Sequence, residues 1–432
     1  MTEPGTDSPI LVLNAGSSSI KFAAFGHSLD ERVAGIADGI GTRDACLKIA
    51  GETLRFNFSD HGAALESVIA ALVKNGLPID KFRAAAHRVV HGGTSLTAPV
   101  RITPTTLEQI AACTPLAPLH NPHNLAAMET LARLAPDLPQ YASFDTAFHA
   151  GMPEVEARYA VPDTIAERGI RRYGFHGISY ASLVRILPEV SGRGLPRRLL
   201  AFHLGNGVSA CAIRDGRSLA TTMGYSPLEG MTMGTRAGDI DANAVLRLAR
   251  EDGLDETARI LNKESGLFGL SGGLSDMRSL LASDTDGARF AVDQFCYRAC
   301  RHAGALIAAM RGCDSIAFTG GIGENAPAIR AQIMAGLDWL GLDFDATAND
   351  ANHPRLHASG SRISAWIGWV FWSVGRRSDQ MSKRRPRSSS AFSSCAMKVS
   401  ESLGHPFRTT WRRGASPSVT ARSAPRRSVV GH

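Results

Sequence analysis

A chain of 432 residues is long enough to form two substantial domains, each with its own buried core. It is 44% hydrophobic and 20% charged, as in ordinary globular proteins, which excludes a wholly disordered or fibrous chain. No run of about 18 apolar residues occurs, so we expect no membrane-spanning helix. The acidic start is unlike a secretory signal, and the scattered cysteines form no C-x-x-C pair, so we expect a cytoplasmic protein with reduced thiols.

Positive charge is concentrated near the end of the chain. The formal net charge is +7, but residues 371–432 contain 13 Arg or Lys against two acidic residues, a net +11. Subtracting this from the total leaves −4 for residues 1–370. The main body is therefore mildly acidic, and the high isoelectric point does not indicate a nucleic-acid-binding body.

Strands and helices are predicted to alternate along the body of the chain. Residues 10–25 have the pattern of an apolar strand, a turn of small residues and a second strand. Residues 62–76 and 124–136 carry Leu, Ile and Ala at three- and four-residue spacing, which predicts helices. Residues 199–213 repeat the strand–turn–strand pattern, which indicates a weak internal duplication and mixed α/β layers.

The boundaries predicted from these patterns give two α/β domains, residues 1–150 and 151–364, and a tail, residues 365–432. The tail has no sustained helical or strand period. Four of the five tryptophans lie between residues 366 and 411, and residues 371–432 contain 14 serines. Because charge, Trp and Ser content all change together, we predict that the tail is disordered and derives from a shifted reading frame.

Three loops rich in small residues follow apolar strands. The first, NAGSSSIK, contains Asn14, three serines and Lys21; the others are HLGNG at 203–207 and GGIGEN at 320–325. Gly and Ser let backbone N–H groups approach an anion closely, and a lysine adds positive charge. One such loop could be a plain turn. Three of them favour a nucleotide between the domains, because open α/β sheets bind ligands at strand ends.

Several charged and polar residues lie in unusual surroundings. Arg88 and Arg236 are flanked by glycines, and a guanidinium suits a carboxylate or a transferring phosphoryl group, although a surface salt bridge is the usual role of one arginine. Asp145 lies among apolar residues, so it is either paired structurally or used as an acid–base or orienting group. His120 and His176 are similarly placed, and a lone histidine is more often structural than catalytic.

Nine segments, in order over roughly residues 10–364, resemble the acetokinase family, which includes acetate, propionate and butyrate kinases. They are LVLNAGSSSIKF, HRVVHGG, APLHNPHNL, FDTAFH, RRYGFHGISY, HLGNGVSA, PLEGMTMGTRAGDID, GLSDMR and FTGGIGEN. The resemblance implies the fold of the actin, sugar-kinase and heat-shock chaperone superfamily, with two ribonuclease H-like α/β domains closing over ATP. It also implies a homodimer that uses Mg²⁺ and transfers the γ-phosphoryl group of ATP reversibly to acetate, giving acetyl phosphate and ADP.

The same resemblance implies roles for individual residues. Asn14 would help to bind Mg²⁺, Asp145 would be the catalytic acidic residue, and His176 and Arg236 would stabilise the transition state. The residues implied to bind the carboxylate substrate are Arg88, Val90, Leu119, His120, Phe175 and Pro227. The residues implied to bind ATP are Lys21, His203, Leu204, Gly205, Asn206, Gly207, Asp276, Met277, Arg278, Gly321, Ile322, Gly323, Glu324 and Asn325.

The chain follows the family pattern to about residues 362–365 and then departs from it. Family members normally continue with a P-T-D-E-E-like segment, one glutamate of which binds magnesium, and a helix that returns to the first domain. Residues 365–432 contain no such segment, so we expect weak magnesium binding and reduced or absent activity. Other functions stay open: a propionate or butyrate kinase, or a non-catalytic ATP-binding protein on the same fold. Nucleic-acid binding through the Arg-rich tail is less favoured, since no folded recognition module accompanies it.

Overall fold

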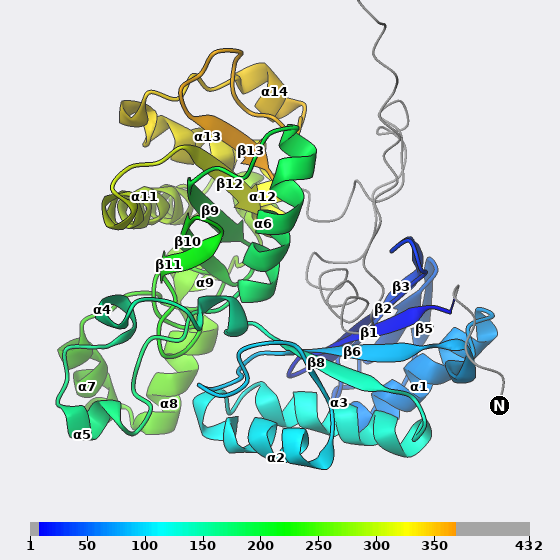
Figure 1. Ribbon diagram of the computed structural model, residues 1–432. Helices are drawn as coiled ribbons and strands as arrows, with labels where there is room; N and C mark the ends of the chain where they lie inside the picture. The colour runs from blue at the N-terminus through cyan, green and yellow to red at the C-terminus, as the bar shows by residue number, and fades with distance from the viewer. Residues whose placement is uncertain (1–7, 369–432) are drawn as a thin grey trace, which may run out of the picture.

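Residues 8–368 are described by the computed structural model, and they form two α/β halves, each built on its own sheet (Figure 1). No helix within this range is both long and apolar enough to cross a membrane. The predictions of disorder and of a shifted reading frame concern residues that, from 369 onward, lie outside the described range.

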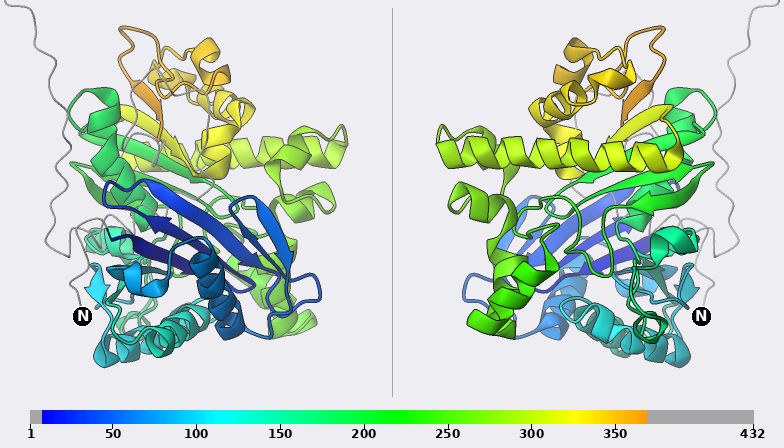
Figure 2. Two further views of the ribbon diagram at one scale, coloured as in Figure 1. Left: turned by 90° about the vertical axis from the view of Figure 1, so that its right-hand side faces the viewer. Right: turned by 90° about the vertical axis from the view of Figure 1, so that its left-hand side faces the viewer.

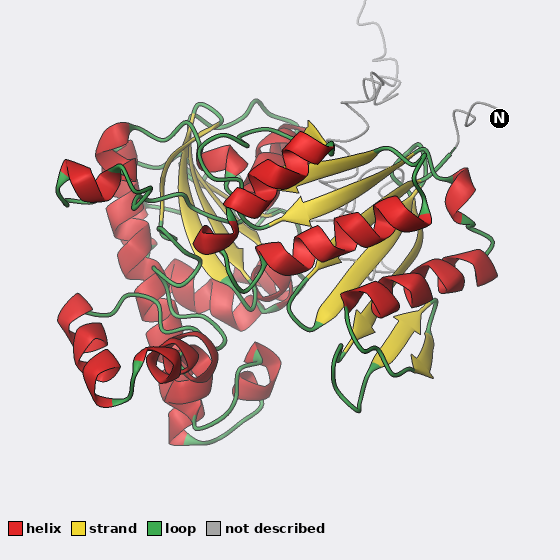
Figure 3. Cartoon of the chain, turned by 90° about the horizontal axis from the view of Figure 1, so that it is seen from below, coloured by secondary structure: helices red, strands yellow, loops and turns green. Residues whose placement is uncertain are grey.

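The first sheet has eight strands in the order β5-β4-β3-β2-β1-β6-β8-β7. Strands β1, β2 and β3 are antiparallel neighbours, whereas β6 runs parallel to both β1 and β8. The core on one face joins Leu13 and Phe22 of the sheet to Leu65, Val68 and Leu131 of helices α1 and α3, and Figure 3 shows helices lying across these strands. The elements are β1 Ile10–Ala15, β2 Ser19–Phe25, β3 Glu31–Asp38, β4 Cys46–Ile49, β5 Glu52–Arg55, α1 His61–Lys74, β6 Ala84–Val89, β7 Val100–Arg101, α2 Pro104–Ala112, α3 Asn121–Leu134 and β8 Gln140–Phe144.

The second sheet has five strands in the order β11-β10-β9-β12-β13. Its elements are β9 Arg198–Leu204, β10 Val208–Arg214, β11 Arg217–Thr221, β12 Ser315–Thr319 and β13 Ser364–Ile367. Helix α6, Gly177–Ser191, packs Tyr180, Leu183 and Leu187 on one face of this sheet. Helix α11, Asp286–Met310, packs Phe295 and Ala299 on the other, and its 25 residues extend past the edge of the sheet in Figure 2.

Shorter helices surround this second sheet. Figure 1 shows α4, α5, α7 and α8 grouped at one end of the half, away from α13 and α14. They are α4 Glu154–Ala157, α5 Asp163–Ala166, α7 Ala242–Glu251, α8 Leu254–Arg259, α9 Gly266–Ser271, α10 Met277–Leu281, α12 Gly320–Asn325, α13 Pro327–Ala335 and α14 Ala346–Asp350.

Both sheets contain the same core topology, which confirms the predicted duplication. In each, an antiparallel hairpin opens the unit (β1–β2 and β9–β10), a third antiparallel strand follows, and two later strands add in parallel beside the first. This is the predicted ribonuclease H-like arrangement, in which the carboxyl ends of the parallel strands of each sheet meet at one edge.

Two local expectations differ from the structure. Gly320–Asn325 was expected as a loop but forms helix α12. The tail was predicted to begin at residue 365, yet Ala365–Ile367 belong to β13, because this apolar stretch pairs in parallel with β12 and is buried.

Candidate active site

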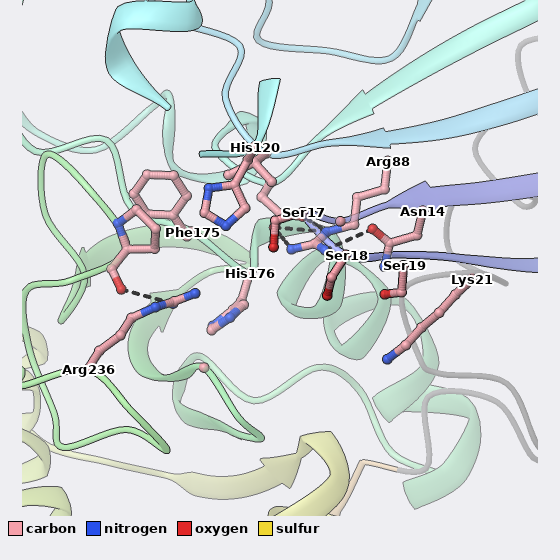
Figure 4. A pocket seen from close by; sticks show the side chains of 15 residues that line it. Asn14, Ser17, Ser18, Ser19, Lys21, Arg88, His120, Phe175, His176 and Arg236 are labelled. Carbon is pink, nitrogen blue, oxygen red and sulfur yellow. Dashed lines mark hydrogen bonds and ion pairs between the residues drawn. The ribbon is translucent and has the colours of Figure 1, made fainter. Parts of the chain in front are cut away.

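A cavity of about 290 Å³ lies where the two halves meet (Figure 4). The first half contributes the ends of β1, β6 and β8 with the loops that follow them, and the second half contributes the residue before α6, the β9–β10 turn and the segment before α7. The cavity is lined by Asn14, Gly16, Ser17, Ser18, Ser19, Lys21, Arg88, Val90, His120, Asp145, Phe175, His176, Gly207, Pro227 and Arg236. The segments that carry these residues are far apart in sequence, and the topology brings them together at the strand ends.

Arg88, Asp145 and Asn14 form one hydrogen-bonded group in the wall of the cavity. The Nε atom of Arg88 donates to both carboxylate oxygens of Asp145 at 3.1 Å, and its Nη2 atom donates to Oδ2 at 2.5 Å. Its Nη1 atom donates to Oδ1 of Asn14 at 3.1 Å. The side chain of Asp145 is 3% exposed and anchors Arg88, whose side chain is 25% exposed, so its guanidinium can meet a further anion.

The serine loop between β1 and β2 presents exposed hydroxyl groups beside the Arg88–Asp145–Asn14 group. Ser17, Ser18 and Lys21 are exposed, whereas the strand residues on either side are buried. The turn is closed by a hydrogen bond from the Gly16 N–H to the Ser19 carbonyl at 2.8 Å, and His61 Nε2 lies 2.6 Å from the Gly16 carbonyl, to which it donates. Small side chains, hydroxyls and a lysine around a fixed turn suit the binding of a phosphate.

His176 enters the cavity from the second half. It precedes α6 in the left-handed region, with φ 58° and ψ 18°. Its Nδ1 atom lies 2.8 Å from Ser209 Oγ, and its ring stacks at a tilt on His203, with centroids 4.1 Å apart. Burial, followed by the nearby His203, Arg88 and Arg236, holds the pKa of His176 well below its ordinary value, so the ring is neutral at pH 7.

Arg236 faces Arg88 across the cavity. Its Nη1 atom donates to the Pro227 carbonyl at 3.2 Å, which orients the guanidinium. Burial and then the charge of Arg88 lower its pKa, although it stays protonated. Two guanidinium groups converge on one small space, and no acid within the described part of the chain pairs with Arg236, so that space attracts an anion.

The predicted acyl pocket is brought together except for one residue. Val90, Phe175 and Pro227 line the cavity, and His120 lies beside them with its pKa lowered to about 4 by burial and then by the two arginines. Leu119 is 50% exposed and is not among the lining residues; it lies in the turn that leads into α3.

The predicted nucleotide-binding residues extend from the cavity along the second sheet. Gly207 lines the cavity, and His203 touches His176, so the β9–β10 turn, residues 203–207, lies directly beside it. Helix α12 starts against the same turn: a Cβ on Gly320 would lie 2.6 Å from the Leu204 carbonyl oxygen. Burial raises the pKa of Glu324 in α12 to about 7, so this carboxyl is only partly ionised at neutral pH.

The predicted nucleotide-binding residues 276–278 do not line the cavity. Asp276 caps α10 by accepting hydrogen bonds from the N–H groups of Arg278 and Ser279 at 3.0 and 3.3 Å. The side chain of Arg278 is 92% exposed, and Met277 is buried in the core with α11. Asp276 and Arg278 can thus reach a ligand only beyond the cavity itself, as expected for the distal part of a long nucleotide.

The polar groups of the cavity fit a magnesium ion that arrives with phosphate oxygens. Asn14 offers an amide oxygen and Asp145 a carboxylate, both held by Arg88. Among residues 8–368 no cluster of three or more His, Cys, Asp or Glu side chains could hold a metal ion. Mg²⁺ keeps several waters and commonly binds through one or two protein oxygens together with substrate phosphates, which this donor set allows.

Two residues of the site were not predicted from the sequence. Ser209 on β10 contacts His176, and its Oγ atom lies 2.5 Å from the hydroxyl of Tyr180 on α6. Nothing in the local pattern distinguishes this serine from others in the chain. The spacing of four residues between His176 and Tyr180, which brings helical side chains together, was the one available signal.

Two sheets of one topology, with a cavity lined by two arginines between them, give the α/β fold of the actin, sugar-kinase and chaperone superfamily. The comparisons with known proteins specify this class further. The model described as the acetokinase family matches residues 9–364, and the chain belongs to that family.

Individual relatives agree with this assignment. An acetate kinase of Rhodopseudomonas palustris is 43% identical over 372 residues, covering 83% of this chain and 94% of the relative. An acetate kinase of Deinococcus radiodurans is 45% identical over 353 residues, covering 79% and 88%. Among solved structures, a propionate kinase from Francisella tularensis matches with a TM-score of 0.79 at 35% identity, covering 83% of this chain and 95% of that one. Porphyromonas gingivalis acetate kinase matches with a TM-score of 0.77 at 34% identity and the same coverage.

Proposed function

We propose that this chain transfers the γ-phosphoryl group of ATP reversibly to acetate, giving acetyl phosphate and ADP. The observation that carries the proposal is the convergence of Arg88, Asp145, His176 and Arg236 on one small cavity with an apolar wall. A carboxylate with a short apolar chain matches a guanidinium beside Val90 and Phe175. A phosphoryl group in transfer matches the second guanidinium and the imidazole.

The proposed step is an in-line displacement. An acetate oxygen held by Arg88 attacks the γ-phosphorus, while the bond from that phosphorus to the β–γ bridging oxygen breaks and ADP leaves with the electron pair. No proton needs to move. Arg236 and His176 donate hydrogen bonds to the equatorial oxygens, where negative charge is spread in the transition state. Asp145 holds Arg88 in place, which orients the nucleophile.

ATP would lie along the second half. The turn at 203–207 and helix α12 would hold the phosphates through backbone N–H groups, and Asp276 to Arg278 would meet the nucleoside end. The serine loop and Lys21 would complete the phosphate site from the first half. A bound Mg²⁺ would neutralise phosphate charge, and Asn14 and Asp145 are the residues that would hold it.

Propionate or butyrate is the alternative acceptor. The Francisella tularensis neighbour is a propionate kinase, and one methylene changes binding by only about 1–3 kcal/mol. The walls that decide the matter are Val90, Phe175 and Pro227. Rates measured with acetate, propionate and butyrate under identical conditions distinguish the three, and we expect acetate to give the highest kcat/KM.

Activity is tested by trapping acetyl phosphate as its hydroxamate in the presence of ATP, Mg²⁺ and acetate. We expect turnover below that of family members, since residues 365–432 contain no D-E-E segment. A version carrying a family-type ending should be more active and need less Mg²⁺. Turnover of the unmodified chain at ordinary family levels would contradict this expectation, whereas ATP hydrolysis indifferent to acetate would favour an ATP-binding switch or chaperone on the same fold.

We also propose a cytoplasmic homodimer. The six cysteines among the described residues are all free thiols, which suits a reducing compartment. Large apolar side chains are exposed in and beside α7 and α8, including Ile240, Leu246 at 51% and Leu254 at 79%. Light scattering on the eluting protein should give twice the chain mass, and Leu246→Glu should shift it towards the monomer.

A further inference from the structure

The imidazole of His176 has one nitrogen turned to the protein and one turned to the cavity. Nδ1 lies 2.8 Å from Ser209 Oγ. Nε2 lies beside Gly207 of the cavity wall, where a Cβ would come within 3.0 Å of it. Figure 4 shows the ring reaching into the space between Arg88 and Arg236. The proton a neutral ring carries can sit on either nitrogen, and only a proton on Nε2 gives the cavity a donor.

The hydroxyl of Tyr180 has one hydrogen-bond acceptor among the described residues. Its hydroxyl is fully buried and lies 2.5 Å from Ser209 Oγ. Burial raises the pKa of Tyr180 well above its ordinary value, so the phenol keeps its proton. Within the described residues, Ser209 Oγ is the hydrogen-bond partner of this hydroxyl. Tyr180 therefore donates to Ser209.

The proton of Ser209 must then go to His176. Ser209 is fully buried, and its Oγ atom contacts Tyr180 and His176 among the described residues. If His176 carried its proton on Nδ1, Ser209 would receive two donors and its own proton would lack an acceptor in a dry environment. A buried unsatisfied hydroxyl is strongly unfavourable. With Nδ1 as the acceptor, all three groups are satisfied.

We propose that Tyr180 and Ser209 are positioning residues that hold His176 as the neutral tautomer protonated on Nε2, so that it presents an N–H to the transferring phosphoryl group. The last clause rests on the proposed function. The orientation of the three groups does not depend on it. The lowered pKa of His176 agrees with a neutral ring in this position.

The test uses the full chain with Ser209→Ala, Tyr180→Phe and a matched control, Ser182→Ala. Ser182 lies on α6, is 4% exposed, and its Oγ atom has no hydrogen-bond partner. Side-chain ¹⁵N resonances of histidine report the tautomer, and His176→Asn assigns the signal. We expect the Nε2–H form in the parent chain and in Ser182→Ala, and a mixture containing Nδ1–H in Ser209→Ala.

Kinetics give a second readout. We expect kcat to fall about 10- to 100-fold in Ser209→Ala with the KM for acetate and for ATP within about threefold, since a donor aimed at the transition state is lost. The decrease in kcat should be smaller in Tyr180→Phe, because Ser209 can still donate to His176 in that variant. Thermal unfolding of all variants identifies any general loss of structure, which would raise KM as well as lower kcat.

Two results are kept apart by these measurements. A His176 ring that keeps its proton on Nε2 in Ser209→Ala, with kcat unchanged, overturns the positioning role. A parent chain that forms no acetyl phosphate but shows the tautomer change on substitution contradicts the proposed function. It still supports the positioning role of Tyr180 and Ser209, because the ¹⁵N signals do not require turnover.

Discussion

Arg236 differs from Arg88, the other arginine of the cavity, in having no acidic partner among residues 8–368. It is oriented by the Pro227 carbonyl and faces a space shared with Arg88. Arg236→Lys keeps the charge but loses the planar set of donors, so we expect kcat to fall by roughly 10²-fold or more. Arg247→Lys is the control, because Arg247 pairs with Glu251 on the exposed face of α7. Equal steady-state rates for the two variants would remove Arg236 from the reaction.

At this scale the sequence predicted most of what the cavity contains. Arg88, Asp145 and Asn14 follow apolar strands, and strand ends in a parallel arrangement meet at one edge, so their proximity could be anticipated. Ser209 could not be found in this way. Its role depends on the register of β9 and β10 and on the placement of α6 over that sheet, and neither is visible in a local pattern.

Helix α12 depends on one glycine where it leaves β12. Gly320 has φ +80°, and a Cβ there would lie 2.6 Å from the Leu204 carbonyl oxygen. Gly320→Ala should therefore destabilise the fold by more than about 1 kcal/mol and raise the KM for ATP. Gly304→Ala in α11, where no neighbouring atom lies within 4 Å, should instead stabilise by about 0.5–1 kcal/mol. Urea unfolding and ATP titration measure both, and a shift of the same sign in the two variants would contradict the prediction.

Sequence reasoning served the strands better than this helix. Apolar runs around small-residue turns predicted β1–β2 and β9–β10, because alternation and turn residues are local signals. Three glycines in Gly320–Asn325 argued against a helix, since glycine is a poor helix former. Buried Arg330 stabilises the helix from outside, because it donates to the Gly323 carbonyl at 2.9 Å and to Asn349 at 2.8 Å. Within the helix, the Glu324 side chain accepts from the Gly320 N–H at 3.2 Å.

The molecule as a whole buries many neutral histidines, and this predicts its response to acid. Burial lowers to about 4 the pKa of a group comprising His87, His91, His120, His149 and His203. An unfolded histidine takes up a proton near pH 6.5, whereas these do so only near pH 4, so the unfolded state binds more protons between the two values. The contribution of these histidines to the free energy of unfolding should be wholly present above about pH 6.5 and should decrease as the pH drops towards 4.

His87 is the residue with which to test this. It is 2% exposed, and its Nε2 atom lies 2.7 Å from Gln140 Oε1. Urea unfolding between pH 4.5 and 7.5 should show a shallower dependence in His87→Gln than in the parent chain. The exposed His353, substituted in the same way, should leave the slope unchanged. A parent chain with equal stability at both ends of this range would overturn the prediction.

The division into halves and the presence of a site between them were predictable, because three strand-end loops of one design occur in both parts of the chain. The way in which the halves face one another was not. It depends on contacts such as the edge-to-face approach of the His91 and Phe175 rings and the hydrogen bond from the Gly177 N–H to the Asp145 carbonyl, which join segments that share no local pattern.

The left-handed backbone of His176 links activity to stability. A residue with a Cβ at φ 58° is held in a conformation that glycine adopts more readily. His176→Gly should therefore be more stable than His176→Ala by about 1 kcal/mol in urea unfolding, although both lose the imidazole. Placing an imidazole at this point costs the fold some of its stability, so selecting variants of this chain for heat resistance alone would tend to remove a residue that lines the cavity.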